Sequence, residues 1–487
     1  MKVLAAVDLG ASSGRVIAAR VHDGRLDLSE VSRFPNRSVA VRGRLYWDVL
    51  GLWASVLDGL RPLGDAAAIG VDSWAVDYGL IDAAGHLIGN PVCYRDARNA
   101  PARDRLLAGT DPADLFARTG IQHQPFNTVF QLAAEDPSRL AAAERLLLVP
   151  DLLGYWLTGT MACEATNAST TGLVDLATGT WDADLCRAAG VDPALLGSIT
   201  PTGTVLGGLL PEVAAATGLT SGTRVVATAS HDTAAAVAAV PYEGDGAAYI
   251  SCGTWSLVGV ERDTPVTTGA ALEAGFTNER GTDGSIRFLR NVAGLWLLNE
   301  SLAAWRRDGL DIDLAALLED AAAAPRLRSV VDPDDPRFAE PGDMPGRIRA
   351  YCDETGQPVP QSPAQVAACV LDSLALAHRR AIDALEALTG EAVQTIHIVG
   401  GGANNTPLCQ WTADATGRTV LAGPDEATAL GNALVQAQAL GLIAPGPAAR
   451  RAAAAASARP RRHTPQGSTR PWEDAASRLQ TLPVGSN

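Results

Sequence analysis

The chain has 487 residues and a formal net charge of −15 at pH 7. This length exceeds what one ordinary hydrophobic core holds, so we expect two or more domains. The negative charge argues against a nucleic-acid partner, because phosphate backbones are bound by basic surfaces. Mean hydropathy is only +0.07, and no run of ~20 apolar residues predicts a membrane span. The segment after Lys2 lacks the pattern of a signal peptide, which favours a cytoplasmic protein.

The cysteines give no sign of a metal site. The chain has 7 of them, with no CxxC pair and no Cys/His cluster of zinc spacing. We interpret them as buried, reduced thiols. Cys352 and Cys369 could approach each other, but a disulfide is unusual in a cytosolic protein.

The first candidate site follows an apolar, strand-like run at residues 3–7. The stretch from Asp8 to Arg15 is rich in Gly, Ala and Ser, and a second strand-like run follows at 16–19. A small-residue turn between two strands can bring backbone N–H groups and hydroxyls close to a phosphate. Asp8, at the end of the first strand, would then face a metal bound to that phosphate. A hairpin with a merely polar turn fits the same residues.

The remainder of the first half predicts a mixed α/β sheet. Residues 48–61 are expected to form a helix, because they begin with an aspartate N-cap and repeat apolar residues on one face. Residues 66–71 are typical of a buried strand, and 100–160 are mostly helical in pattern. Residues 223–229 predict a strand that leads into Ser230-His231-Asp232-Thr233 and an alanine-rich run.

The second half begins after a turn-rich break at 241–246. Residues 247–260 repeat the opening arrangement of strand, small-residue turn and strand, which indicates a duplicated domain. A long capped helix is expected at 363–389, and a strand at 395–399 runs into the glycine-rich stretch from Gly400 to Asn405. A glycine run between a strand and a helix is typical of nucleotide sites, although a tight turn fits it as well.

Two common phosphate-binding motifs are absent from the sequence. There is no GxxxxGK[ST] loop, and no GxGxxG follows the first strand. Two hairpins and one glycine run therefore remain as the candidate nucleotide site. A triphosphate held between the hairpins would need a carboxylate on the acceptor side, because phosphoryl transfer depends on positioning and on removal of one proton.

Acidic and aromatic residues near strand ends are the candidates on the acceptor side. Asp232, at the predicted start of a helix, is the best candidate for the proton acceptor, with a plain N-cap as the alternative. We assign the neighbouring His231 to substrate binding. Asp72 and Asp77, with Trp74 between them, would bind sugar hydroxyls and stack on a sugar face, or would simply be turn and edge-strand residues.

The chain resembles the FGGY carbohydrate kinases of the actin/hexokinase/Hsp70 superfamily over about residues 2–440. The resemblance rests on ordered stretches along the chain: Asp8 to Arg15, Gly70 to Asp77, Tyr94 to Arg98, Thr166 to Thr171, His231 to Ala234, Ser251 to Gly259, and Gly400 to Asn405. It implies an α/β fold of two duplicated ribonuclease-H-like (actin-like ATPase) domains, with a nucleotide and sugar cleft between them.

The resemblance also implies the domain organisation and the activity. Residues 1–242 would form the sugar- and phosphate-binding domain, 243–443 the nucleotide-binding domain, and 444–487 a low-complexity, flexible tail. The activity would be ATP- and Mg²⁺-dependent phosphorylation of L-rhamnulose at its 1-hydroxyl by a monomer or homodimer. The alternative acceptors are another small ketose or a deoxy-sugar, namely L-fuculose, a pentulose or a linear signalling sugar. A non-enzymatic, actin-like sensor is a different class, against which Asp232 argues.

The residues that would bind ATP and Mg²⁺ follow from the matching positions. The ATP phosphates would contact the first hairpin and the tip of the second, at Ala11, Ser12, Ser13, Gly14, Arg15 and Thr254. Gly401 would lie along the nucleotide, with Asn405 near the base. Asn299 would be a further nucleotide contact, shorter than the Gln often found there. Asp8 would support Mg²⁺ through water.

The sugar-side residues follow from the same matching. Asp232 would accept the proton and also contact the sugar, together with His231, Thr233 and Asn291. The backbone at Ala75 would complete the set. This position is commonly Gly in the family, so the alanine narrows the expected pocket by one methyl group.

Overall fold

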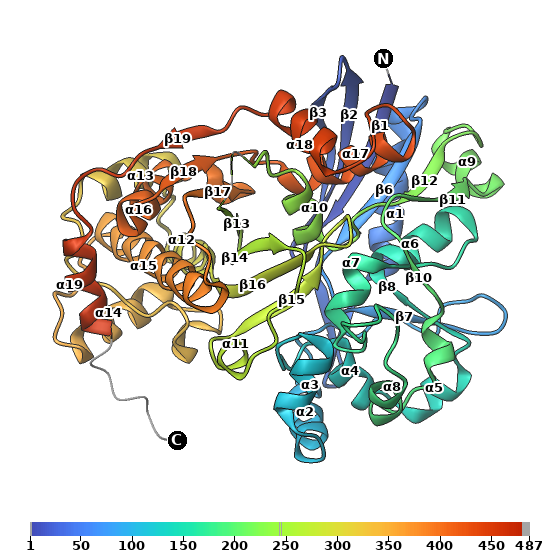
Figure 1. Cartoon of the computed structure of the whole chain (residues 1–487), viewed down its shortest axis with the longest axis horizontal. Coiled ribbons are helices and arrows are strands. Elements are labelled where there is room, and N and C mark those ends of the chain that lie inside the picture. Colours follow the sequence, from blue (N-terminus) through green and yellow to red (C-terminus); the bar gives the residue numbers. More distant parts are fainter. Residues whose placement is uncertain (1, 243, 245, 480–487) are drawn as a thin grey trace. The chain divides into compact units, whose positions relative to one another are not determined.

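The computed structural model describes residues 2–242, 244 and 246–479 (Figure 1). The chain divides into two compact units. Unit 1 comprises Met1–Pro241, Glu261–Phe288 and Ala427–Ala458, and unit 2 comprises Tyr242–Val260, Leu289–Glu426 and Arg459–Asn487. Each unit is described by itself.

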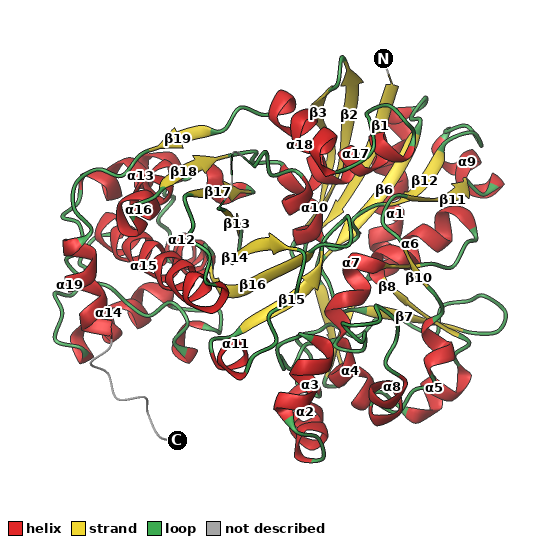
Figure 2. Ribbon diagram, in the orientation of Figure 1, coloured by secondary structure: helices red, strands yellow, loops and turns green. Residues whose placement is uncertain are grey.

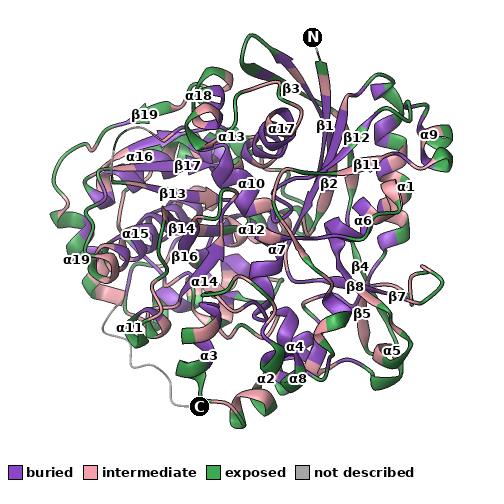
Figure 3. Ribbon diagram, turned by 45° about the vertical axis from the view of Figure 1, so that its right-hand side comes forward, coloured by how far each residue is buried: buried purple, intermediate pink, exposed green. Residues whose placement is uncertain are grey.

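Unit 1 is built on a six-stranded sheet with the order β11-β12-β6-β1-β2-β3. In that order the strands are Thr204–Gly208, Arg224–Ala227, Ala68–Ser73, Lys2–Leu9, Ser13–His22 and Arg25–Pro35. β1 pairs antiparallel with β2 and parallel with β6, and β6 pairs parallel with β12. The parallel strands are almost wholly buried, whereas β3 carries many exposed residues (Figure 3).

Side-chain alternation along β1 directs its two faces to different helices. Ala5, Val7 and Leu9 join the core formed with α1 (Val49–Leu60) and α6 (Val149–Thr158). Ala6, on the other face, packs with Ala429 of α17 (Ala427–Ala439). Asp8 therefore points to the same face as α17.

Helix α17 returns from the C-terminal part of the sequence to the sheet of unit 1, beside β1 (Figure 1). It packs closely on α10 (Asp232–Ala238): a Cβ at Gly431 would lie 1.8 Å from the carbonyl oxygen of Ala235. Only glycine allows this approach. Gly70 of β6 likewise allows α17 to approach the sheet, since a Cβ at Gly70 would lie 2.4 Å from Asn432 Oδ1.

Unit 1 also contains shorter strands, helices and turns outside this sheet (Figure 2). The strands among them are β4 (Ser38–Val41), β5 (Arg44–Trp47), β7 (Tyr78–Ile81), β8 (Arg145–Leu148), β9 (Cys163–Glu164), β10 (Ile199–Thr200) and β15 (Phe276–Arg280). The α-helices are α2 (Asn99–Ala108), α3 (Pro112–Thr119), α4 (Thr128–Ala133), α5 (Pro137–Ala142), α7 (Ala165–Ala168), α8 (Ala183–Ala188), α9 (Pro211–Thr217), α11 (Gly269–Glu273) and α18 (Pro447–Ser457). Short 3₁₀ turns lie at η1 (Arg61–Leu63), η2 (Ser169–Thr171) and η3 (Pro193–Leu196).

Unit 2 repeats the hairpin-plus-parallel-strand arrangement. β13 (Ala247–Cys252) pairs antiparallel with β14 (Trp255–Arg262) and parallel with β17 (Thr395–Val399). β17 pairs parallel with β18 (Thr419–Ala422), and β18 pairs antiparallel with β19 (Arg461–His463). The order β14-β13-β17-β18 matches β2-β1-β6-β12 of unit 1, as the expected duplication requires.

The helices of unit 2 include the predicted long helix, α15 (Pro363–Thr389), with Ser362 as N-cap and Gly390 as C-cap. The others are α12 (Trp296–Arg307), α13 (Leu314–Ala323), α14 (Met344–Glu354), α16 (Thr406–Thr416) and α19 (Arg470–Leu479), with η4 (Pro336–Phe338) and η5 (Gly401–Asn404). β16 (Ile286–Ala293) and β14 both continue along the chain from one unit into the other.

The prediction of a flexible tail from residue 444 is wrong for the residues that the structure describes. Helix α18 lies against β3, where Leu26 N donates to Ser457 Oγ (2.8 Å), and its Ala454 is fully buried. In α19, Trp472 is buried beneath Arg326. The alanine-rich composition is that of a packed helix, so the chain does not divide at residue 443. Residues 480–487 lie outside the described part.

The cysteines are buried free thiols, as predicted. Cys352 and Cys369 are hydrogen-bonded to each other without a disulfide. Within the described residues, no helix is both long and apolar enough to cross a membrane.

Candidate active site

Acidic residues gather at the carboxyl ends of the parallel strands in unit 1, the edge at which α/β sheets bind ligands. Asp8 at the end of β1 lies in register with Asp72 near the end of β6. Ser73 N donates to Ser230 O (2.9 Å), and Ser73 forms a parallel bridge with His231. The sheet thereby brings the segment that carries Asp232 to the same edge.

The β1–β2 hairpin has a tight turn at residues 10–12. Gly10 N donates to Ser13 O (2.9 Å), and Ser12 is exposed at the tip. Asn36 braces the turn: its side chain donates to Gly10 O (2.9 Å) and its backbone N–H to Ser12 O (3.0 Å). Sequence patterns gave no signal for Asn36. At Gly14, a Cβ would lie 2.2 Å from the Phe34 ring, so glycine fits without rearrangement.

The hairpin also holds an ion pair. The Arg15 guanidinium donates from Nη2 to Asp8 Oδ2, and both side chains are largely buried. The predicted phosphate ligand and the predicted metal-site carboxylate are therefore direct neighbours. Ala11 lies half-buried beside them in the turn.

The suggestion that Asp72 binds sugar is wrong. Its side chain is fully buried, and its Oδ2 accepts from Asn432 Nδ2 of α17 (2.5 Å). The same amide donates to Gly70 O (3.1 Å). Burial raises the pKa of Asp72 well above its ordinary value, and the charges of Asp8 and Asp232 add to the rise. Asp72 therefore fastens α17 to the sheet.

Trp74 and Asp77 are also structural rather than sugar-facing. Asp77 is buried, and Oδ2 accepts from the indole N–H groups of Trp47 (2.5 Å) and Trp74 (2.9 Å). Gln131 donates to its other oxygen (2.9 Å). Burial raises the pKa of Asp77 to about 6 against the effect of these hydrogen bonds. The two indole rings are tilted by 42° with centroids 4.5 Å apart, and Trp74 is buried, so its ring is not accessible to a sugar.

Ala75 lies in a strained loop between β6 and β7. The next residue, Val76, has φ +70°, a left-handed conformation that is costly for a β-branched side chain. Its carbonyl accepts from Thr128 Oγ1 (2.7 Å), which fixes the loop from α4. Ala75 itself is half-buried, whereas its neighbours in the chain are buried.

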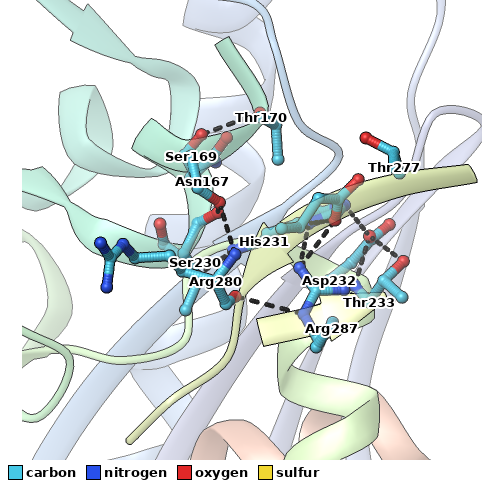
Figure 4. A network of polar contacts seen from close by, with 12 residues as sticks. Asn167, Ser169, Thr170, Ser230, His231, Asp232, Thr233, Thr277, Arg280 and Arg287 are labelled. Atoms are coloured by element: carbon cyan, nitrogen blue, oxygen red, sulfur yellow. Dashed lines mark hydrogen bonds and ion pairs between the residues drawn. The ribbon is translucent and has the colours of Figure 1, made fainter. Parts of the chain in front are cut away.

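Asp232 stands at the start of α10 and is one-third exposed (34 %). Its Oδ1 accepts from Thr233 N (2.6 Å) and Thr233 Oγ1 (3.2 Å), and lies 3.3 Å from His231 Nε2 (Figure 4). Burial raises the pKa of this carboxyl, as does Asp8, while His231 and Thr233 oppose the rise. The site thus holds a reachable carboxylate whose affinity for a proton is increased.

Behind His231 lies a buried ion pair that sequence reasoning missed. Glu279 of β15 and Arg287 of β16 are 2.7 Å apart, and both approach His231 Nδ1, at 3.3 Å and 3.1 Å respectively. Burial favours protonation of Glu279, but the charges of Arg287 and His231 outweigh it and lower its pKa to about 2. No motif marks these strand residues, since only the fold brings them to His231.

A second buried carboxylate fixes the backbone before His231. Glu164 Oε2 accepts from Ser230 N (3.1 Å), Ser230 Oγ (2.9 Å) and Thr166 Oγ1 (2.6 Å). His231 N donates in turn to Thr166 Oγ1 (3.3 Å). The hydroxyl-rich loop at residues 166–171 therefore supports the candidate catalytic segment from within unit 1.

In unit 2, the tip of the β13–β14 hairpin exposes Thr254. Neutral groups support it: Ser256 Oγ lies 3.2 Å from His378 Nε2, and His378 Nδ1 lies 3.0 Å from Thr412 Oγ1. Burial lowers the pKa of His378 to about 4, so the ring is uncharged at neutral pH. One imidazole therefore links β14, α15 and α16.

The glycine run of unit 2 passes close to the end of β13. A Cβ at Gly402 would lie 2.2 Å from Cys252 Sγ, and Gly400 has φ +79°. Gly401 is exposed. Asn405 is buried, and its side chain caps α16 by accepting from Leu408 N (3.1 Å).

Two further predicted ligand-binding residues, the sugar contact Asn291 and the nucleotide contact Asn299, also belong to unit 2. Asn291 lies on β16 and Asn299 in the first turns of α12, and both are exposed. Both amides are therefore accessible for hydrogen bonding to a ligand.

Two family models match nearly the whole chain. The model for the FGGY family of carbohydrate kinases, N-terminal domain, matches residues 3–238, and that for the C-terminal domain matches 248–440. The rhamnulokinase of Bacteroides thetaiotaomicron is 42% identical over 443 residues, which cover 90% of each chain. That of Bacillus subtilis is 40% identical over 438 residues, or 89% of this chain and 90% of the relative.

Solved structures share the fold at low sequence identity. A xylulose kinase from Lactobacillus acidophilus superimposes with a TM-score of 0.81 at 16% identity, covering 98% of this chain and 96% of that one. A Plasmodium falciparum glycerol kinase gives 0.78 at 14% identity, with coverage of 98% and 97%. The predicted two-domain kinase fold is confirmed, and the chain belongs to the FGGY family of carbohydrate kinases.

Proposed function

We propose that this sugar kinase transfers the γ-phosphoryl group of ATP to the 1-hydroxyl of L-rhamnulose. The observation that carries the proposal is the 40–42% identity to the two rhamnulokinases over about nine-tenths of the chain. Asp232 supplies the chemistry, because it is the accessible carboxylate at the ligand-binding edge of the unit 1 sheet. Other ketoses and deoxy-sugars remain the comparison substrates.

In the proposed reaction, Asp232 accepts the proton of the sugar 1-hydroxyl. The freed oxygen electron pair forms the new bond to the γ-phosphorus, the bond to the bridging oxygen breaks, and ADP leaves. A raised pKa suits this role, since it increases the affinity of the carboxylate for that proton. His231, Thr233, Asn291 and the Ala75 backbone are the proposed sugar contacts.

The nucleotide contacts belong to the same proposal. The hairpin of unit 1 would bind phosphate through Ala11, Ser12, Ser13, Gly14 and Arg15. Unit 2 would contribute Thr254, Gly401 and Asn299. The exposed positions of Ser12, Thr254 and Gly401 support these assignments, because each stands at a turn where backbone N–H groups are accessible.

Asp8 would support Mg²⁺. The described residues contain no group of three or more His, Cys, Asp or Glu side chains arranged to hold a metal. This donor set fits Mg²⁺ delivered with ATP, because Mg²⁺ keeps several waters and is usually bound by one or two carboxylates plus substrate phosphates. The ion would neutralise phosphate charge during transfer.

A panel of sugars tests the proposal directly. ADP release would be measured with L-rhamnulose, L-fuculose, L-ribulose and D-xylulose as acceptors. We expect the highest kcat/KM for L-rhamnulose, and a higher value for any other sugar would overturn the substrate assignment. We further propose a cytoplasmic location, where ATP is supplied, and a monomeric or dimeric state that light scattering would measure.

A further inference from the structure

The buried ion pair of Glu279 and Arg287 contacts Nδ1 of His231, whereas Asp232 lies at Nε2 of the same ring. Arg287 is wholly buried, and its Nε is further fixed by the carbonyl of Arg280 (3.2 Å). Stability alone does not explain why this ion pair is buried, because the cost of desolvating two charges generally offsets their attraction. Its contact with His231 suggests that reason.

Arg287 and Glu279 both contact Nδ1 of His231, but they favour different protonation states of that nitrogen. Arg287 can only donate, so its approach to Nδ1 requires a lone pair there and places the proton on Nε2. Glu279 can only accept, so its approach requires a proton on Nδ1. A ring protonated on Nδ1 alone would turn the Nε2 lone pair toward the carboxylate 3.3 Å away. Both favourable arrangements, the Nε2–H tautomer and the imidazolium, therefore carry a proton on Nε2.

The resulting Nε2–H group faces Asp232 Oδ1, which already accepts from Thr233 N and Thr233 Oγ1. Among the described residues, the two hydrogen-bond donors to this carboxylate both act on Oδ1, and the imidazole lies against the same oxygen. This arrangement leaves Oδ2 for an incoming hydroxyl. The charged groups around this pair include Asp8 and Asp72 near Asp232, and Glu279 and Arg287 beside His231.

We propose that Glu279 and Arg287 are positioning residues that hold His231 with Nε2–H on Asp232 Oδ1, so that Oδ2 is the oxygen that receives the substrate proton. The inference rests on the proposed function, since it assumes that Asp232 is the base. It adds two residues and the choice of oxygen to that assignment.

The kinetic test uses Glu279→Gln and Arg287→Lys, with Glu261→Gln as the matched control. Glu261 is also ion-paired in unit 1, to Arg451 at 3.2 Å. We expect the two test variants to lose between about 10- and 100-fold in kcat, because a misaligned base costs rate steeply. The KM for ATP should stay within about twofold. The acid limb of the kcat profile should move to higher pH, because His231, whose charge lowers the pKa of Asp232, is no longer held beside it. Glu261→Gln should match the wild type.

A wild-type measurement covers the case in which the variants do not fold. The protein would be labelled with ¹⁵N-histidine, and the ring signals of His231 would be assigned by their loss in His231→Gln. The ¹⁵N NMR spectrum then shows which ring nitrogen is protonated. We expect a protonated Nε2, and an unprotonated Nε2 at neutral pH would overturn the proposal. Wild-type kcat and pH profile in folded Glu279→Gln would overturn it too. Turnover retained by Asp232→Asn would instead refute the assignment of the base, so the two failures are distinguishable.

Discussion

The two hairpins share a backbone arrangement but rest on different kinds of side chain. The β1–β2 hairpin of unit 1 carries the Asp8–Arg15 ion pair, and its strand edge also holds Asp72 and Asp232. The β13–β14 hairpin of unit 2 is supported by the uncharged link from Ser256 through His378 to Thr412. Under the proposed function, the charged copy would accept the proton and support Mg²⁺, and the uncharged copy would hold the nucleotide.

The largest expected effect is that of Asp232→Ala. Loss of the general base should lower kcat by roughly 10²-fold or more. The dissociation constant for ATP, measured by calorimetry, should change little, because the proposed nucleotide contacts are untouched. Asp58→Ala, an exposed change on α1, serves as control. Near-normal turnover of Asp232→Ala would remove Asp232 from the mechanism.

Asp8→Asn should have the next largest effect and should be specific to the charged hairpin. We expect kcat to fall by about 10-fold and the Mg²⁺ concentration for half-maximal activity to rise, because an amide is a weaker ligand for a hard cation. Activity would be titrated with MgCl₂ at fixed ATP. Asp23→Asn, in the exposed β2–β3 turn, should leave the titration unchanged. An unaltered Mg²⁺ requirement in Asp8→Asn contradicts the metal role.

His378→Leu should affect the neutral hairpin alone. It removes the imidazole partner of Thr412 Oγ1 and one of the two partners of Ser256 Oγ, which costs about 1–3 kcal/mol of unfolding free energy. The KM for ATP should rise a few-fold, while the KM for the sugar and the Mg²⁺ requirement stay unchanged. Ser301→Ala, a buried hydroxyl bonded only within α12, is the control. A changed Mg²⁺ requirement would break the contrast between the hairpins.

The smallest effect concerns acid stability. The pKa of His378 is about 4 in the folded chain and 6.5 in its ordinary state, so the unfolded chain binds more protons between these values. Stability therefore rises with pH from 4 to 6.5, by up to about 1.4 kcal/mol per pH unit from this group. Urea midpoints at pH 7, 5.5 and 4.5 should fall less steeply in His378→Leu than in the wild type. Parallel slopes would show that the ring titrates normally.

Local sequence patterns predicted much of the fold and part of the site. The helix at α1, the capped α15 and the strand that delivers Asp232 follow from periodicity and capping residues, which act over a few positions. Both hairpins are also predicted by local patterns of apolar and small residues. Their resemblance to one another, about 240 residues apart along the chain, predicts the duplication.

The missed features all depend on contacts between distant parts of the chain. No local sequence pattern predicts that α17 packs on β1, or that Arg287 contacts His231. Asp77 and Trp74 were misjudged because a polar residue after a strand looks the same whether it faces a ligand or a buried indole. The alanine-rich tail was misjudged because composition alone does not distinguish a packed helix from a flexible segment.

Identification of the product tests the central claim most directly. The full-length protein would be incubated with L-rhamnulose, ATP and MgCl₂, and the products analysed by ³¹P and ¹³C NMR. The account predicts one sugar phosphate, with phosphorus coupled to carbon 1, formed in equal amount to ADP. Phosphorylation at another carbon, or ADP formed without any sugar phosphate, would contradict it.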